Sequence, residues 1–268
     1  MAHSINTDPS YLRNVQYRDS RNLDARIALH DRFSINPYPW HRWLFDQLAL
    51  PPASRVLDVG CGAGTMWVKN RDRLDPTWEL TLSDFSSGML NAARQGLAGG
   101  NLTVRFEQVD AQSIPHADDS FDVVIANHML YHVPDRDPAI AEIHRVLRAG
   151  GRLYAATNGH AHLRELDQLA APFAPATEMI DSATRFGLET GLAQLQRRFG
   201  DVRALRYEDG LVVTDAEPLI AYIRSMSATA TISKEALGKL RAHIDHEIAM
   251  RGAVRITKDS GLFVAMKS

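Results

Sequence analysis

The sequence has very few features of secreted, membrane-bound or metal-binding proteins. Cys61 is the only cysteine among 268 residues, which excludes an internal disulfide and any site built from several thiolates. No stretch approaches the roughly 18 consecutive apolar residues of a membrane span. The first ten residues, MAHSINTDPS, lack the basic cluster and the apolar run of a secretory signal. We therefore expect a cytoplasmic protein with no membrane partner.

An excess of charge of one sign is also absent. The chain has 30 Lys and Arg against 32 Asp and Glu, a formal net charge of -2. No clustered Lys/Arg run offers a surface for phosphate backbones, so we expect no nucleic-acid partner. Hydrophobic residues at 45% and charged residues at 23% are ordinary for a globular chain, and its length fits one large domain with a smaller addition. Either a monomer or a homodimer is compatible with these properties.

From Arg55 onwards, short apolar runs alternate with helical stretches, as in strand-helix-strand units. The expected strands are 55–59, 79–84, 104–110, 122–127 and 152–157. The expected helices between them are 64–73, 86–97 and 137–148, the last ended by a glycine C-cap at Gly150. Connections of this length favour right-handed crossovers with helices on both faces of a parallel sheet.

Helical segments are expected before and after this core. Before it, amphipathic helices are predicted over 20–34 and from Trp40 to the Pro51-Pro52 stop. After it, the expected elements are helices within 160–182 broken at Pro172 and Pro175, a helix over 188–199, a strand over 202–207, and helices over 216–226 and 233–250. A final pair of strands, AVRIT and GLFVAMK, is expected next, the second of them over 262–267. Lys258-Asp259-Ser260-Gly261 has the composition of a hairpin turn, so the last strand should be antiparallel.

These elements predict an α/β fold with a doubly wound, mostly parallel seven-stranded sheet, an antiparallel last strand and a helical cap. We divide the chain into an N-terminal helical lid (1–50), a Rossmann-like core (51–159), and a segment that completes the sheet and adds the helical cap (160–268). The cap would lie over the strand ends.

The strongest functional motif is LDVGCGAG, residues 57–64, between a predicted strand and a predicted helix. Glycines at such a turn let the backbone approach a ligand closely. The spacing is GxGxG, whereas the dinucleotide fingerprint requires GxGxxG, and Thr65 stands where its third glycine would be. This favours a ligand other than a pyrophosphate cofactor. A tight turn with a purely structural role is the alternative.

Polar residues also end the next three predicted strands. Asp84 can accept hydrogen bonds from the two hydroxyls of a ribose, and Phe85 can pack on an adenine face. Asp110 can accept from an adenine amine, with Ala111 offering a backbone amide and Gln112 assisting. Asn127 ends the fourth strand. Open α/β sheets bind ligands at this carboxyl edge, so four such strand ends in sequence predict one nucleoside site.

LDVGCGAG, LTLSDFSSGML, VDAQSIPHADDSFDVVIANHMLYHVPD and RVLRAGGRLYAAT together resemble the ordered motifs of the class I methyltransferases, mainly those that act on small molecules. The resemblance covers roughly residues 55 to 157. It implies that S-adenosylmethionine is the cofactor, with the backbone of Gly60, Cys61 and Gly62 on its methionine part, Asp84 on the ribose, and Asp110 with Ala111 on the adenine. Asp58 would orient the loop and the cofactor amino group.

Methyl transfer from a sulfonium is a direct displacement that needs alignment and a dry cavity more than a catalytic residue. Where the acceptor must lose a proton, His132 and His128 are the best placed candidate bases. For each of them, a packed, hydrogen-bonded histidine is the alternative role. The two histidines are four residues apart, but no third ligand is suggested, so we do not expect a metal site. Tyr17, Arg26, His30 and Tyr131 are candidates for contacts from the lid or with the acceptor, and simple surface roles for the lid residues remain open.

The predicted activity is transfer of a methyl group to a nitrogen, oxygen or carbon of a small molecule. An NAD-dependent oxidoreductase is one alternative, because it shares the glycine turn and the ribose-binding acid. A non-catalytic regulatory protein that binds S-adenosylmethionine is the other. The sequence does not identify the acceptor, because one fold serves many chemistries.

Overall fold

The computed structural model describes residues 7–100, 102–173, 183–226 and 232–268. Within them, one sheet has the strand order β3-β2-β1-β4-β5-β7-β6. Its strands are β1 (Arg55–Val59), β2 (Glu79–Asp84), β3 (Thr103–Gln108), β4 (Phe121–Ile125), β5 (Leu147–Asn158), β6 (Asp201–Val213) and β7 (Val254–Met266). β1 to β5 pair in parallel, while β7 is antiparallel to both β5 and β6. The predicted seven-stranded sheet with an antiparallel last strand is confirmed.

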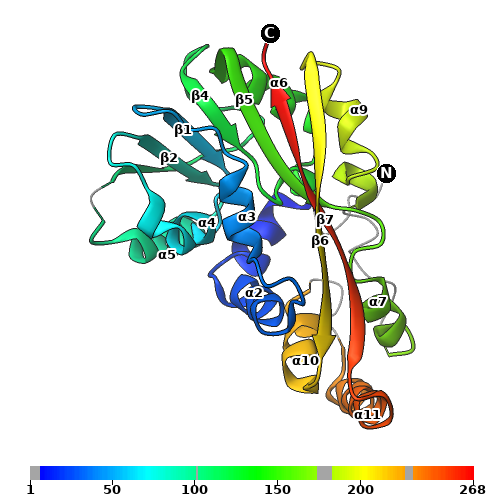
Figure 1. Cartoon of the computed structure of the whole chain (residues 1–268). Helices are drawn as coiled ribbons and strands as arrows, with labels where there is room; N and C mark the ends of the chain where they lie inside the picture. The colour runs from blue at the N-terminus through cyan, green and yellow to red at the C-terminus, as the bar shows by residue number, and fades with distance from the viewer. Residues whose placement is uncertain (1–6, 101, 174–182, 227–231) are drawn as a thin grey trace.

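Helices cover both faces of the sheet (Figure 1). An apolar core lies on each face of the sheet, and alternate residues of β1 belong to different cores. Leu57 and Val59 pack with α6 (Arg136–Val146) and α9 (Gly191–Leu195). Val56 packs with α3 (Trp40–Asp46) and α4 (Thr65–Lys69) on the other face. α5 (Ser87–Leu97) connects β2 to β3. The doubly wound arrangement follows from strands that are apolar on both sides.

The helical cap is built on an extension of the sheet. β6 and β7 continue to pair beyond Asn158, where β5 ends, so their far halves project past the carboxyl edge. A third apolar cluster joins this extension to α2 (Arg21–Phe33), α7 (Arg164–Ala170), α10 (Ala216–Arg224) and α11 (Lys234–Arg251). Two short N-terminal helices, α1 (Pro9–Tyr11) and η2 (Leu12–Gln16), precede α2. In the described part of the chain, no helix has the length and apolarity to cross a membrane.

The predicted hairpin turn at 258–261 is wrong, because β7 runs through it without interruption. Each polar side chain there has a partner on a neighbouring strand: Lys258 pairs with Asp209, Asp259 with Arg206, and Ser260 donates to Asn158. Composition cannot distinguish a solvated turn from polar residues that are satisfied across a sheet. For the same reason β6 extends to Val213, beyond the strand expected over 202–207.

The predicted glycine C-cap at Gly150 is also wrong. α6 ends at Val146, and β5 begins at Leu147 with an irregular pairing to β4. Gly150 has a φ of +73° inside this strand, where its N–H donates to the carbonyl of Lys267. Its left-handed conformation therefore serves an irregular strand pairing rather than a helix end.

Several predicted helices are shorter than expected. α3 ends at Asp46, before the proline stop, and α9 covers only the middle of the helix expected over 188–199. The 64–73 segment divides into α4 and a 3-10 turn, η3 (Arg71–Arg73). The helices expected over 20–34, 216–226 and 233–250 are found as α2, α10 and α11. The break predicted at Pro175 lies outside the described residues.

Candidate functional site

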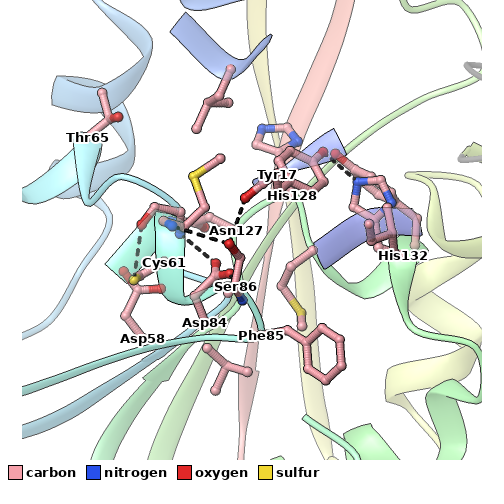
Figure 2. Close-up of a pocket in the computed structure, with 18 of the residues that line it drawn as sticks. Tyr17, Asp58, Cys61, Thr65, Asp84, Phe85, Ser86, Asn127, His128 and His132 are labelled. Atoms are coloured by element: carbon pink, nitrogen blue, oxygen red, sulfur yellow. Dashed lines mark hydrogen bonds between the residues drawn. The ribbon is translucent and has the colours of Figure 1, made fainter. Parts of the chain in front are cut away.

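A cavity of about 370 Å³ lies at the carboxyl edge of the sheet, and every site candidate from the sequence analysis lines it. The glycine turn, the ends of β2 and β4, and the N-terminal lid contribute its walls (Figure 2). The structure therefore brings together all the predicted residues: Tyr17, Arg26, His30, Asp58, Gly60, Cys61, Gly62, Asp84, Phe85, Asp110, Ala111, Gln112, Asn127, His128, Tyr131 and His132.

The glycine turn is held open and fixed to the neighbouring strand. Gly60 and Gly62 have φ values of +70° and +56°, which L side chains rarely adopt. A Cβ at Gly60 would lie 2.7 Å from Cβ of Met129, so the turn closely approaches the segment after β4. The Gly62 N–H donates to Oδ2 of Asp84 at 2.9 Å, which joins the turn after β1 to the end of β2.

Asp84 connects the turn to the lid. Its Oδ1 accepts the Ser86 N–H at 2.8 Å, and the Ser86 hydroxyl donates to the Tyr17 carbonyl at 2.6 Å (Figure 2). Burial raises the pKa of Asp84, although these backbone N–H groups favour its charged form. Each carboxylate oxygen keeps acceptor capacity for a further donor.

Asp58 and Asn127 present buried acceptors at the same end of the cavity. The Trp67 indole N–H donates to Oδ2 of Asp58 at 2.7 Å, whereas Oδ1 of Asp58 and Oδ1 of Asn127 have no hydrogen-bond partner among the described residues. Burial raises the pKa of Asp58 to about 7. An unpaired buried acceptor is costly, so these atoms indicate a donor that the chain itself does not supply.

Asp110 and Gln112 form the rim next to β3. Both the backbone N–H and the side-chain amide of Gln112 donate to Oδ1 of Asp110, at 2.9 and 3.2 Å. Ala111 between them is buried, while Asp110 is exposed. At the same rim, the Arg13 guanidinium lies 5.5 Å from the centre of the Phe85 ring.

The lid places Tyr17 on His132. The Tyr17 hydroxyl lies 2.9 Å from Nε2 of His132, although 115 residues separate them in sequence. Tyr131, next to His132, is half-buried, and the desolvation of its phenol raises the pKa of that group. Tyr17 and His132 were both candidate site residues from the sequence, but no local pattern predicted that they are in contact.

Arg26 and His30, the other lid candidates, also face the cavity but have different surroundings. The Arg26 guanidinium donates to the hydroxyl and the carbonyl of Ser225 at 3.0 and 2.7 Å, so it binds the end of α10. Burial, and then the charge of Lys258, hold the pKa of His30 well below its usual value. Burial likewise lowers the pKa of His128 to about 4.

The cap end of the cavity contains residues that the sequence analysis missed: His41, Asn158, His162, Lys258 and Ser260. Burial lowers the pKa of His41 to about 3 and that of His162 well below its usual value. Asn158 ends β5 and could have been found by the rule that selected Asp84. Lys258 lay in the predicted turn, so no local signal pointed to it. Among the described residues, no group of three or more His, Cys, Asp or Glu is arranged to hold a metal ion.

A family model described as "Methyltransferase domain" matches residues 57–155 of this chain. The ubiquinone/menaquinone biosynthesis C-methyltransferase UbiE of Xanthomonas oryzae pv. oryzae is 32% identical over 136 residues, 50% of this chain and 53% of that protein. The demethylmenaquinone methyltransferase of Lactobacillus johnsonii is 30% identical over 152 residues, 54% of this chain and 62% of that protein. The chain thus spans little more than half the length of these curated relatives.

Solved structures share the fold at low sequence identity. The YcgJ protein of Bacillus subtilis superposes with a TM-score of 0.59 at 19% identity, covering 85% of this chain and 97% of that one. A phosphoethanolamine N-methyltransferase of Haemonchus contortus, in complex with S-adenosylmethionine, gives a TM-score of 0.59 at 18% identity, covering 99% and 60%.

The glycine turn and the polar residues at the four strand ends all lie within the segment that the family model matches. Residues 57–155 of this chain therefore match a methyltransferase domain, and they lie within a Rossmann-like α/β fold that is shared with an S-adenosylmethionine-bound methyltransferase.

Proposed function

We propose that this chain binds S-adenosylmethionine at the glycine end of its cavity and transfers the methyl group to a nitrogen, oxygen or carbon of a small molecule. The observation that carries the proposal is the convergence of the ends of β1, β2, β3 and β4 on one cavity, with Asp84 hydrogen-bonded to the glycine turn. The matched family model and the names of the relatives support the same reaction class.

The residues present fit this cofactor. Unpaired acceptors on Asp58 and Asn127 match the ammonium group of its methionine part, and the open backbone at Gly60 and Gly62 admits that part closely. Asp84 has two oxygens with remaining acceptor capacity for a ribose diol. Phe85, Asp110, Ala111 and Gln112 would surround the adenine.

The bound cofactor would supply an electrophilic methyl carbon on a positively charged sulfur, and that sulfur would leave as a neutral thioether with the electron pair of the broken bond. The chain's own contribution is to orient the acceptor and to exclude water. Trp40, Leu44 and Met129 give the cavity apolar walls, and the η2–α2 segment covers it from the N-terminal side. A separate catalytic metal is not needed for this displacement.

A base is useful where the acceptor is a hydroxyl or an ammonium. Nε2 of His132 lies 2.9 Å from the Tyr17 hydroxyl, so a proton from the acceptor can reach His132 directly or through the phenol. The Tyr17 carbonyl accepts the Ser86 hydroxyl, so the lid is fixed to the cavity next to this pair. His128 is a weaker candidate base, because a pKa of about 4 makes it a poor proton acceptor near neutral pH.

Two alternatives deserve separate tests. An NAD-dependent oxidoreductase is disfavoured by the GxGxG spacing and by the matched family model. A binding protein without turnover has the same cofactor site, so only product formation separates it from an enzyme. The names of the relatives make a quinone precursor methylated on carbon one acceptor to include in an activity panel.

Asp84→Ala tests the cofactor site. Calorimetry with S-adenosylhomocysteine and with NAD should show binding of the first only, and the substitution should weaken it about 100-fold, because two hydrogen bonds to a charged group contribute about 3 kcal/mol together. Asp245→Ala, an exposed carboxylate on α11, is the matched control and should leave affinity unchanged. Preferential binding of NAD, or unchanged affinity in Asp84→Ala, would overturn the proposal.

A further inference from the structure

The end of the cavity under the cap contains hydrogen-bond donors that the proposed reaction does not use. Resting on the proposed function, we propose that Lys258, His162 and Asn158 form a receptor for an anionic oxygen group, a carboxylate or a phosphate, carried by the methyl acceptor. All three residues line the cavity. The proposal assigns a substrate class to the site, acidic small molecules, and it leaves the cofactor end unchanged.

Lys258 provides the positive charge. Its ammonium group donates to Oδ2 of Asp209 at 2.5 Å, and it lies 5.4 Å from the centre of the Tyr207 ring. Its side chain is 6% exposed and that of Asp209 is fully buried. Asp209 also accepts from the Ser34 hydroxyl and the Asn36 N–H, so its charge is shared among several donors. An ammonium group has three N–H donors, and Asp209 uses one of them.

His162 provides a neutral donor with a defined tautomer. The backbone N–H of Asp259 donates to Nδ1 of His162 at 3.3 Å, so a neutral imidazole must carry its proton on Nε2. The turn that holds His162 is fixed to β7, because the Gly159 N–H donates to the Asp259 carbonyl and the Leu163 N–H to the Thr257 carbonyl. The ring therefore presents an Nε2–H donor.

Asn158 provides the third donor. The Ser260 hydroxyl donates to Oδ1 of Asn158 at 2.8 Å, which fixes the amide orientation and leaves its NH₂ group for another acceptor. Asn158 and Ser260 are also register partners across β5 and β7. Lys258 and Ser260 are two residues apart on β7, so their side chains leave the same face of the strand. Lys258, His162 and Asn158 thus meet where β5 ends.

The charges around this end favour an anion over a cation. Burial is the main cause of the lowered pKa values of His30, His41, His128 and His162, and the field of the Lys258 ammonium lowers each of them further. Arg26, which also lines the cavity, is hydrogen-bonded to Ser225. The carboxylates that line the cavity, Asp58, Asp84 and Asp110, lie at the glycine end, apart from Asp31, which pairs with Lys69. A substrate carboxylate would gain charge-assisted hydrogen bonds here, whereas an ammonium would be repelled.

The test titrates the protein, loaded with S-adenosylhomocysteine, with acetate, inorganic phosphate and the neutral isostere acetamide, and follows the ¹⁵N signals of histidine side chains. We expect saturable shifts of the His162 signals with at least one of the two anions and none with acetamide. A response to acetate only or to phosphate only identifies the head group. An equal response to acetamide, or no saturable response to either anion, would overturn the proposal.

Asn158→Asp sharpens the test without removing the buried lysine. The new carboxylate stays within reach of the Ser260 hydroxyl and should weaken anion binding at least tenfold by repulsion and by loss of a donor. Asn91→Asp, an exposed position on α5, adds the same charge outside the cavity and should change nothing. Unchanged anion affinity in Asn158→Asp contradicts the assignment. S-adenosylhomocysteine affinity, measured on the same samples, reports the proposed function separately, so either idea can fail alone.

Discussion

The two ends of the cavity have opposite electrostatic character. At the glycine end, burial raises the pKa values of Asp58 and Asp84, and Oδ1 of Asp58 and Oδ1 of Asn127 are buried acceptors without a partner among the described residues. At the cap end, burial lowers the pKa values of His30, His128 and His162, and Lys258 adds a positive charge. A cavity organised in this way suits a cationic group at one end and an acidic or neutral polar group at the other.

The two ends of the cavity are also built from different parts of the fold. The glycine end is made by strand ends and turns of the parallel core, where each polar residue directly follows an apolar run. The cap end is made where β5, β7, α2 and α10 meet, so it depends on contacts between segments far apart in sequence. Changes at the two ends should therefore have different consequences.

The largest expected effect lies where the two ends meet, at Tyr17 and His132. With an acceptor that must lose a proton, His132→Gln and Tyr17→Phe should each lower kcat by roughly 10² to 10⁴, the usual contribution of general base catalysis. Steady-state kinetics measures kcat, and calorimetry should show S-adenosylhomocysteine affinity within about twofold of the original. His246→Gln, at an exposed position on α11, is the control. Unchanged kcat in both variants would remove the base from the mechanism.

The next largest effect concerns the stability of the cap end. Lys258→Met leaves Asp209 buried without its cation, which should lower the free energy of unfolding by about 3 to 5 kcal/mol. Lys239→Met breaks an ion pair with Glu235 in which both side chains are exposed, and it should cost less than about 1 kcal/mol. Urea unfolding followed by circular dichroism measures both. Equal effects would show that the buried pair between β6 and β7 adds no more stability than an exposed ion pair.

The smallest expected effect is on the pH dependence of the free energy of unfolding, to which the two ends of the cavity contribute with opposite signs. His128 has a pKa of about 4 when folded, below its usual 6.5, so the unfolded chain binds more protons between these values and His128 destabilises the fold as the pH falls through that window. Asp58, with a pKa raised to about 7, acts in the opposite direction and destabilises the fold as the pH rises from about 4 to 7. His30, His41 and His162 also line the cavity, and burial lowers the pKa of each, so they act in the same direction as His128.

We therefore expect the free energy of unfolding to fall between pH 6.5 and pH 4.5, and His128→Asn to reduce that fall by about 2 kcal/mol. Asparagine suits this position, because residue 128 has a φ of +53° and asparagine tolerates left-handed backbone. Urea unfolding at the two pH values gives the difference, and His246→Asn serves as the exposed control. An identical fall in His128→Asn would mean that this ring is not held neutral by burial.

The glycine end could be predicted because its signals are local. Gly60, Asp84, Asp110 and Asn127 were each selected from a few neighbouring residues, and the parallel topology then required them to share one edge of the sheet. The cap end could not be predicted in this way. A hairpin at Lys258 and a glycine C-cap at Gly150 were reasonable from composition, and both were wrong because cross-strand partners decided the backbone.

The sequence by itself determined the alternation of strands and helices, the sheet and the acids at its carboxyl edge, because apolar periodicity and glycine spacing act over a few residues. Only the tertiary structure decided that Tyr17 meets His132, that Asp209 pairs with Lys258, and that Asp259 fixes the tautomer of His162. These contacts join residues 49 to 115 positions apart. Such pairings depend on how the cap and lid pack on the sheet, and no local pattern records that packing.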